Sequence, residues 1–284
     1  MISLAYIGGM GLMASPAAIH LSNSSVAKVL SVHDRGTQSS RHEEARAAWI
    51  THGAQMYRTL SDTITAQPVD GVVICCGKNG DDLPLLSEVC RKLRPRGEQA
   101  PFILHLSTVS ANFVRAAHQY CNRFNIDYAN YPLTGGPLGA QAGGASDKGM
   151  LILASGNGAL YHRLLPFLSV IGKPKYFGAD VTKGTESKLI GHFLVYNGLL
   201  GISSALALHS EGFSQPLGSN NQVEYFDFLI QGAGGTRQWE IAARKGIANG
   251  IWDQGFLIPH AVVDALYAAQ LCISRKLPRI ILQP

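Results

Sequence analysis

Short apolar runs alternate with amphipathic segments through the first 180 residues of the chain. Apolar runs bounded by glycine, proline or polar residues are typical of buried strands, and apolar positions three or four apart are typical of helices. The predicted strands are Ile2–Ile7, Val29–His33, Ala54–Tyr57, Val69–Cys76, Phe102–Leu106, Asp127–Tyr131 and Met150–Ala154. The predicted helices between them are Ala17–Leu21, Glu43–Gly53, Leu83–Leu93, Ala111–Phe124 and Tyr161–Ile171. This alternation predicts a mainly parallel sheet with helices on both faces.

The pattern changes at about residue 180, after which no strong strand is predicted. Long helical periodicity begins at Lys183, and the segments that follow have the spacing of helices. These predicted helices are Lys183–Ser210, Glu224–Leu229, Gln238–Ala248 and Pro259–Ser274. We therefore predict an α/β fold in which a doubly wound domain, residues 1–180, precedes an all-helical domain, residues 181–284.

The segment Gly9–Ala14 has the pattern G-x-G-x-x-A and lies between a predicted strand and a predicted helix. Gly9 allows a tight turn, Gly11 lets a pyrophosphate approach the backbone, and Ala14 lets the helix pack closely on the strand. The start of the helix then offers N–H groups to the phosphates. The alternative is a tight strand–helix turn that binds no ligand.

An acidic residue, Asp34, ends the second predicted strand about twenty residues after the glycines. A carboxylate at this position binds ribose hydroxyls in Rossmann-type dinucleotide-binding domains and repels a 2′-phosphate. Arg35 follows and would soften that repulsion, so either NAD or NADP fits and Asp34 favours NAD. The residues expected to bind the cofactor are Gly9, Met10, Gly11, Met13, Asp34, Arg35 and Thr108. The alternative for Asp34 is a solvated turn residue.

Composition narrows the functional classes. Hydrophobic residues make up 46% of the chain and charged residues 15%, which is typical of a globular protein. The chain has no basic run with interleaved aromatic residues, so we expect no nucleic-acid partner. We also expect no apolar run to span a bilayer. The first strand begins at Ile2, so we expect no signal peptide. Five cysteines without metal-ligand spacing predict no metal site and favour a reducing, cytoplasmic compartment.

Four ordered motifs resemble those of the β-hydroxyacid dehydrogenases, typified by 3-hydroxyisobutyrate dehydrogenase and related to 6-phosphogluconate dehydrogenase. Gly9–Ala14 is similar to the opening glycine motif of that family, and Ser107–Ser110 to its S-T-x-S segment. Tyr131–Ala140 resembles its glycine-rich substrate segment. Gly184–Leu189 matches its G-x-x-x-K-L motif, whose lysine is catalytic in the family.

The resemblance implies a hydride transfer between NAD(P) and a small 3-hydroxyacid or its semialdehyde or keto form. Lys188 would be the general acid/base, and His192, four residues later on a helix, would assist it. The residues expected to bind the anionic substrate are Ser107, Thr134, Gly135 and Gly136. The alternatives are that Lys188 is a surface lysine and that His192 is a core histidine bonded to a backbone carbonyl. Likewise, Ser107 could only cap a helix, and the glycine-rich segment could be an ordinary connection between strands.

The chain also departs from the family pattern. His192 stands where the family usually has Asn, and Val263-Asp264-Ala265 matches a later K-D-L segment only loosely. Imine reductases share the architecture but usually lack the lysine, so Lys188 argues against that class. An imine or ketone reductase and a non-catalytic dinucleotide-binding protein remain the alternatives.

The resemblance also implies a homodimer, because helical domains of the family pack on each other. The helical part of this chain has apolar residues that need cover, namely Phe226, Phe228, Leu229, Ile230, Phe256, Leu257 and Ile258.

Overall fold

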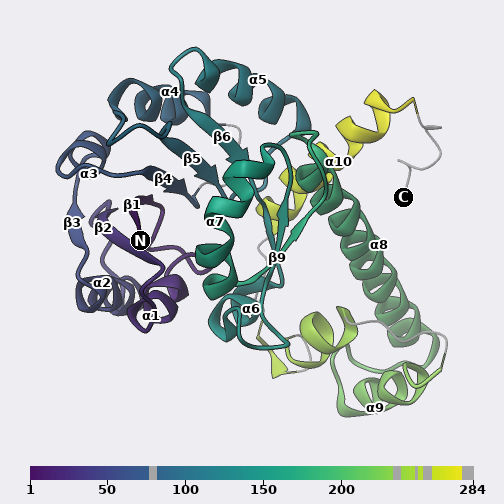
Figure 1. Cartoon of the computed structure of the whole chain (residues 1–284). Coiled ribbons are helices and arrows are strands. Elements are labelled where there is room, and N and C mark those ends of the chain that lie inside the picture. Colours follow the sequence, from purple (N-terminus) through teal and green to yellow (C-terminus); the bar gives the residue numbers. More distant parts are fainter. Residues whose placement is uncertain (77–81, 233–237, 247–248, 252–257, 277–284) are drawn as a thin grey trace. The chain divides into compact units, whose positions relative to one another are not determined.

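The computed structural model describes residues 1–76, 82–232, 238–246, 249–251 and 258–276. The chain divides into two compact units (Figure 1). The first contains Met1–Lys188 and Gln270–Pro284, and the second contains Leu189–Ala269.

Six parallel strands form the main sheet of the first unit. In spatial order they are β3 (Gln55–Tyr57), β2 (Ala27–His33), β1 (Ile2–Ile7), β4 (Gly71–Ile74), β5 (Phe102–His105) and β6 (Asp127–Asn130). The strand order reverses between β1 and β4, which is the arrangement of dinucleotide-binding folds. The predicted doubly wound sheet is therefore confirmed, and its carboxyl edge beside β1 and β4 is where such folds bind ligands.

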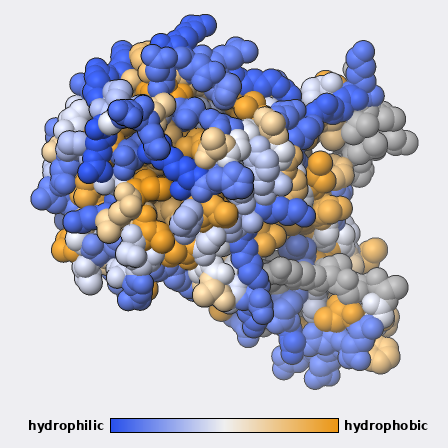
Figure 2. Space-filling view, in the orientation of Figure 1, coloured by the Kyte–Doolittle hydropathy of each residue, from blue (hydrophilic) through white to orange (hydrophobic). Residues whose placement is uncertain are grey.

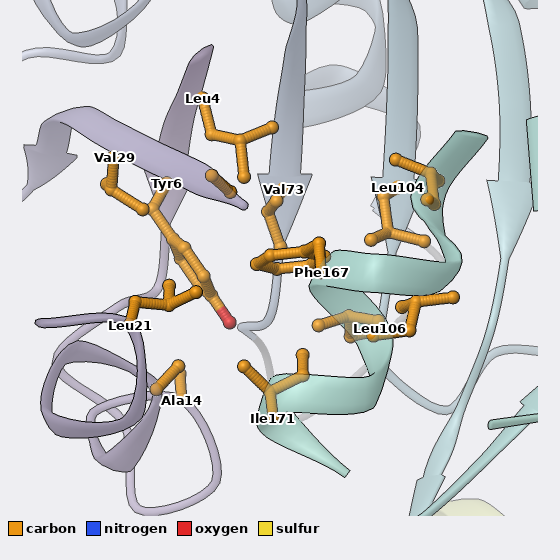
Figure 3. Packing of buried hydrophobic residues seen from close by; sticks show 14 of the residues in the cluster. Leu4, Tyr6, Ala14, Leu21, Val29, Val73, Leu104, Leu106, Phe167 and Ile171 are labelled. Atoms are coloured by element: carbon orange, nitrogen blue, oxygen red, sulfur yellow. The ribbon is translucent and has the colours of Figure 1, made fainter. Parts of the chain in front are cut away.

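Helices cover both faces of this sheet because side chains alternate along each strand. Leu4 and Tyr6 of β1 face one apolar cluster, whereas Ala5 and Ile7 face the other. The helices of the first unit are α1 (Pro16–Ser22), α2 (Ser40–His52), α3 (Leu60–Thr65), α4 (Leu83–Lys92), α5 (Ala111–Asn122), α6 (Gly136–Ala142) and α7 (Gly158–Ile171). Figure 3 shows α7 laying Phe167 against the strands that carry Val73 and Leu104.

A second, three-stranded sheet follows the main one. Its order is β7 (Leu133–Thr134), β8 (Leu151–Ala154) and β9 (Lys173–Tyr176), with β7 antiparallel to β8 and β9 parallel to it. The segment Met150–Ala154, predicted as a further strand of a mainly parallel sheet, belongs here instead. The sequence did not predict β7, which has two residues, or β9, whose sequence is KPKY, since neither has an apolar run.

The remaining helices begin with α8 (Lys183–Gly212), which runs without interruption from the first unit into the second. It is followed by α9 (Asn220–Leu229) and α10 (Ile258–Ser274). The predicted helix Gln238–Ala248 is observed as a π-helix over Trp239–Arg244, and its last two residues lie outside the described part. Among the described residues of the second unit there is no strand, which confirms a helical C-terminal region.

By length and composition alone, α8 could cross a membrane, although helices in the core of soluble proteins pass the same test. The sequence-based expectation that no stretch could do so is wrong on this point. Polar residues such as His192, Asn197 and Ser203 interrupt the apolar run, but they leave the helix apolar on average.

Candidate active site

The turn after β1 is built on glycines. Gly8 has φ +81°, and a Cβ there would lie 2.3 Å from the carbonyl oxygen of Cys75. Gly9 does not have a positive φ, but a Cβ on it would lie 2.9 Å from Val32 Cγ1 and 3.1 Å from Trp49 Nε1. The tight turn predicted for Gly9 is therefore made by Gly8, and Gly9 is required by close packing.

The rest of the turn folds back on itself before α1 begins. The Gly11 N–H donates to Gly8 O at 3.0 Å, and the Ala14 N–H donates to Gly11 O at 3.0 Å. Ala14 is buried in the core beside Leu21, as predicted for a small residue at this position (Figure 3). Met10 is buried and Met13 packs against the same cluster, so both side chains stabilise the turn. A Cβ at Gly8 would overlap the backbone of Cys75, and a Cβ at Gly9 would crowd Val32 and Trp49, so the turn can pack here only with glycine at both positions.

Asp34 lies at the carboxyl end of β2 and is buried rather than solvated. Its Oδ1 accepts a hydrogen bond from the Gly36 N–H, and its Oδ2 accepts one from Arg46 Nε, both at 2.8 Å. Burial alone would raise the pKa of Asp34, but these two bonds and the charges of Arg46 and Arg58 hold that pKa below its ordinary value. Asp34 is therefore a carboxylate at neutral pH, and the adjacent Arg35 is exposed.

Ser107 and Thr108 follow β5 at the same edge of the sheet. Ser107 Oγ donates to Cys76 O at 2.7 Å and accepts from the Cys76 N–H at 3.1 Å. Thr108 is partly exposed. The cap of α5 is Ser110, whose side chain accepts a hydrogen bond from the Phe113 N–H, as predicted. Ser107 thus joins the ends of two neighbouring strands rather than capping a helix.

Lys188 lies in the second turn of α8 and is 5% exposed. Its Nζ donates to the carbonyl oxygen of Leu133 at 2.6 Å. Thr134, Gly135 and Gly136 follow Leu133 directly, and the two glycines have φ values of +129° and +67°. The structure thus places the predicted acid/base lysine against the predicted substrate segment, and it rules out a surface lysine.

Several contacts hold this part of α8 on the first unit, among them a hydrogen bond from the Gly184 N–H to Ser155 Oγ at 2.9 Å. Thr185 Oγ1 donates to Asn130 Oδ1 at 2.6 Å, and Asn130 Nδ2 donates to the carbonyl oxygens of His105 and Ser107. Glu186 accepts hydrogen bonds from Arg275 at 2.6 Å and from Lys183 at 3.1 Å. These contacts fix the rotation of α8 about its axis, and with it the direction of Lys188.

His192 belongs to the second unit, where a buried polar cluster holds it. Its Nδ1 lies 2.6 Å from Asp264 Oδ2 and 3.0 Å from the Tyr196 hydroxyl, which in turn donates to Asp264 at 3.2 Å. Burial and the Asp264 charge raise the pKa of Tyr196, so it stays a neutral hydroxyl. A carboxylate therefore holds His192 in place.

Several site residues were not identified from the sequence. Gly8, Arg46 and Asn130 each act through a contact that is distant in sequence, with Cys75, Asp34 and Thr185 respectively. Asn130 ends a strand at the carboxyl edge, which was the available signal.

The first unit fits a dinucleotide. The glycine turn lies between β1 and α1, where this fold binds the pyrophosphate, and the buried Asp34 follows the next strand, where a ribose is held.

Comparisons with known proteins identify the family of the first unit. A family model described as the NAD binding domain of 6-phosphogluconate dehydrogenase matches residues 3–184. The 2-(hydroxymethyl)glutarate dehydrogenase of Eubacterium barkeri is 26% identical over 219 residues, which are 73% of this chain and 63% of that enzyme. The chain thus spans less than two thirds of that relative's length.

Two solved structures show the same fold at low identity. The 3-hydroxyisobutyrate dehydrogenase of Salmonella typhimurium superposes with a TM-score of 0.77 at 18% identity, over 98% of this chain and 89% of that one. An imine reductase variant from Myxococcus stipitatus, in complex with NAD+, superposes with a TM-score of 0.60 at 21% identity, over 98% and 89%.

Proposed function

Since the chain belongs to the family of the NAD binding domain of 6-phosphogluconate dehydrogenase, we propose that it is an oxidoreductase transferring a hydride between NAD(P) and a small 3-hydroxyacid, or its semialdehyde or keto form. The observation that supports this most strongly is the buried amino group of Lys188 beside the Leu133–Gly136 segment. A buried amine beside a glycine-rich backbone is suited to moving a proton at a substrate oxygen.

The cofactor would lie along the carboxyl edge of the main sheet. The turn from Gly8 to Ala14 would hold the pyrophosphate, and Asp34 and Arg35 would hold the adenine-side ribose. Thr108, partly exposed at the same edge, would contact the cofactor further along. When bound, the nicotinamide supplies the hydride chemistry for oxidising an alcohol or reducing a carbonyl.

Lys188 would transfer the proton in both directions of the reaction. In oxidation, its neutral amine accepts the hydroxyl proton as the carbonyl forms; in reduction, its ammonium donates that proton to the carbonyl oxygen. The Leu133 carbonyl holds Nζ in place, which limits the loss of side-chain freedom when substrate binds. His192 is one turn further along α8 and would donate a hydrogen bond to the same substrate oxygen.

The substrate carboxylate would bind at Thr134, Gly135 and Gly136. Gly136 has no Cβ and its surroundings are open, since a Cβ built there meets no atom within 4 Å. The Thr134 hydroxyl and backbone N–H groups are suitable donors to an anion. Ser107 would act by holding the neighbouring strand ends rather than by direct contact, because its hydroxyl already bonds Cys76.

An imine or ketone reductase is the second candidate. It is favoured by the replacement of the family's usual Asn by His192, which is tied to Asp264 and Tyr196. In that reaction His192, rather than Lys188, would donate the proton.

The test is a panel of 3-hydroxyacids, their methyl esters and cyclic imines, assayed with NAD and NADP by nicotinamide absorbance. We expect turnover of a 3-hydroxyacid and at least a tenfold lower kcat/KM for its methyl ester, because the ester lacks the carboxylate. Turnover of imines alone would favour the second candidate. Cofactor binding without turnover of any compound would favour a binding protein.

We further propose a homodimer in the cytoplasm, formed through the helical domain. Large apolar side chains are exposed on α8, α9 and α10, and hydrophobic residues reach the surface there in Figure 2. They include Leu194, Leu200, Leu208, Phe228, Leu229, Ile258 and Leu266. Of the residues predicted to need cover, Phe226 and Ile230 are half-buried, and Phe256 and Leu257 lie outside the described part. Large exposed apolar side chains on these helices support the proposal of an interaction surface there.

Light scattering tests the dimer. Leu194→Glu on α8 should yield a monomer at micromolar concentration. The matched change Ile50→Glu, at an exposed apolar position of α2, should leave the dimer intact. A fully active wild-type monomer would contradict the proposal.

A further inference from the structure

The ribose end of the cofactor site contains an ion pair that the sequence does not reveal. Asp34 is 3% exposed, and both oxygens of its carboxylate accept hydrogen bonds, one from the Gly36 N–H and one from Arg46. A carboxylate in this position excludes a 2′-phosphate only while its charge is uncompensated. Here a guanidinium lies 2.8 Å away, so most of that repulsion is offset.

Helix α2 holds Arg46 firmly against Asp34. Trp49, three residues later on the same helix, is fully buried, and its Nε1 donates to the carbonyl oxygen of Gly9 at 2.9 Å. Trp49 also packs against Tyr6 of β1. Because Trp49 ties α2 to the glycine turn, the position of Arg46 relative to the phosphate-binding backbone is built into the fold.

Two more arginines lie close to Asp34, Arg58 through the effect of its charge and Arg35 as the next residue of the chain. Arg58, which follows β3, packs on Gly36, where any Cβ would overlap its guanidinium. Arg35 is exposed directly after Asp34. Glu43, in the first turn of α2, is the other described acidic residue that acts on Arg46. Three positive and two negative charges therefore leave this end of the site positive.

We infer that Arg46 is a specificity-determining residue: by pairing with Asp34 it converts the ribose end of the site into one that prefers a 2′-phosphorylated dinucleotide, with Arg35 and Arg58 as the phosphate-binding cations. This rests on the proposed dinucleotide site. The pairing reverses the preference for NAD that Asp34 alone predicts, because Arg46 neutralises the charge of Asp34. Guanidinium groups are suited to the role because they bind phosphate oxygens with paired N–H donors.

Calorimetric titration with two probes tests the inference without any turnover. The probes are 2′,5′-ADP and 5′-AMP, which differ only in the 2′-phosphate. The wild-type protein should bind 2′,5′-ADP at least tenfold more tightly. Arg46→Met should reduce that ratio at least tenfold, because Asp34 then repels the phosphate. Arg58→Met should weaken 2′,5′-ADP several-fold and leave 5′-AMP unchanged, and the exposed Arg123→Met should change neither.

The outcomes separate this inference from the function on which it rests. Equal affinities for the two probes in the wild-type protein, or an unchanged ratio in Arg46→Met, would overturn the role of Arg46 while leaving the dinucleotide site in place. If Arg46→Met does not fold, an unchanged ratio in Arg58→Met overturns the inference. Failure of the wild-type protein to bind either probe, NAD or NADP would overturn the dinucleotide site and this inference with it.

Discussion

Each unit of the molecule buries a histidine against a tyrosine hydroxyl. In the first unit His105 Nδ1 lies 3.0 Å from Tyr128, and in the second unit His192 Nδ1 lies 3.0 Å from Tyr196. The two differ in one partner: Asp264 lies 2.6 Å from His192, whereas none of the described carboxylates bonds to His105. Burial lowers the pKa of His105 to about 4, so it is neutral at physiological pH.

Under the proposed function, the two histidine–tyrosine pairs serve different purposes. Buried among rings, His105 is a neutral packing group whose hydroxyl partner satisfies one nitrogen. The Asp264 carboxylate, 2.6 Å from Nδ1 of His192, fixes the orientation of the ring, which a group proposed to handle protons requires. The role of each buried histidine is therefore inferred from the residue that lies beside the histidine–tyrosine pair, and not from burial of the histidine.

The largest expected effect comes from replacing Lys188, the residue that His192 is proposed to assist. Lys188→Met should lower kcat by about two to four orders of magnitude, the usual share of acid/base catalysis. Binding of NAD(P), measured by titration, should be nearly unchanged, because the glycine turn and Asp34 are untouched.

Two matched variants complete this test. Lys92→Met changes an exposed lysine in the last turn of α4, remote from α8 in the sequence, and should keep near wild-type kcat. His192→Asn restores the family's usual residue and should cost less than Lys188→Met. Near wild-type kcat in Lys188→Met would reject the proposed mechanism and leave His192 as the proton donor of the reductase alternative.

The next effect is on stability and tests the neutral histidine. Because the pKa of His105 is about 4 in the folded protein and 6.5 when unfolded, the unfolded chain takes up the proton first as pH falls. Stability from this group is complete above pH 6.5 and declines toward pH 4, by about 3 kcal/mol in total. Urea unfolding between pH 7.5 and 4.5 measures it. His105→Gln, which retains a partner for Tyr128, should give a shallower slope; identical slopes would contradict the assignment.

The sequence predicted the main sheet well because its evidence is local. Strands such as Phe102–His105 are apolar runs, and the glycine turn has a fixed spacing. Lys188 was located through its flanking motif. Contacts between distant residues left no local signal: the Arg46–Asp34 and Asp264–His192 pairs join residues 12 and 72 positions apart.

Short elements were missed for a related reason. The helix α6 begins with Gly136-Pro137, which favours a turn, and β7 has only two residues. Their conformation is set by the antiparallel pairing of β7 with β8 and by the close approach of Gly139 to Met150. Tertiary contacts thus decide the conformation of the segment that is proposed to bind substrate.

The smallest expected effect comes from removing the carboxylate charge beside His192, which makes its surroundings similar to those of His105. Asp264→Asn removes the carboxylate charge beside His192 and keeps the size of the side chain. Loss of a charge-assisted hydrogen bond of about 1.5–3 kcal/mol, only partly expressed in the transition state, should lower kcat/KM roughly tenfold. Asp264 acts through His192 and is a positioning residue, so the split between kcat and KM is the decisive readout. The loss should appear mainly in kcat, and it should disappear when His192 has already been changed to Asn. Asp264→Glu should restore part of the activity, and Glu224→Gln, at an exposed position of α9, should leave the activity unaltered. An equal loss in the His192→Asn background would mean that Asp264 only supports the helices, and His192 would then be as structural as His105.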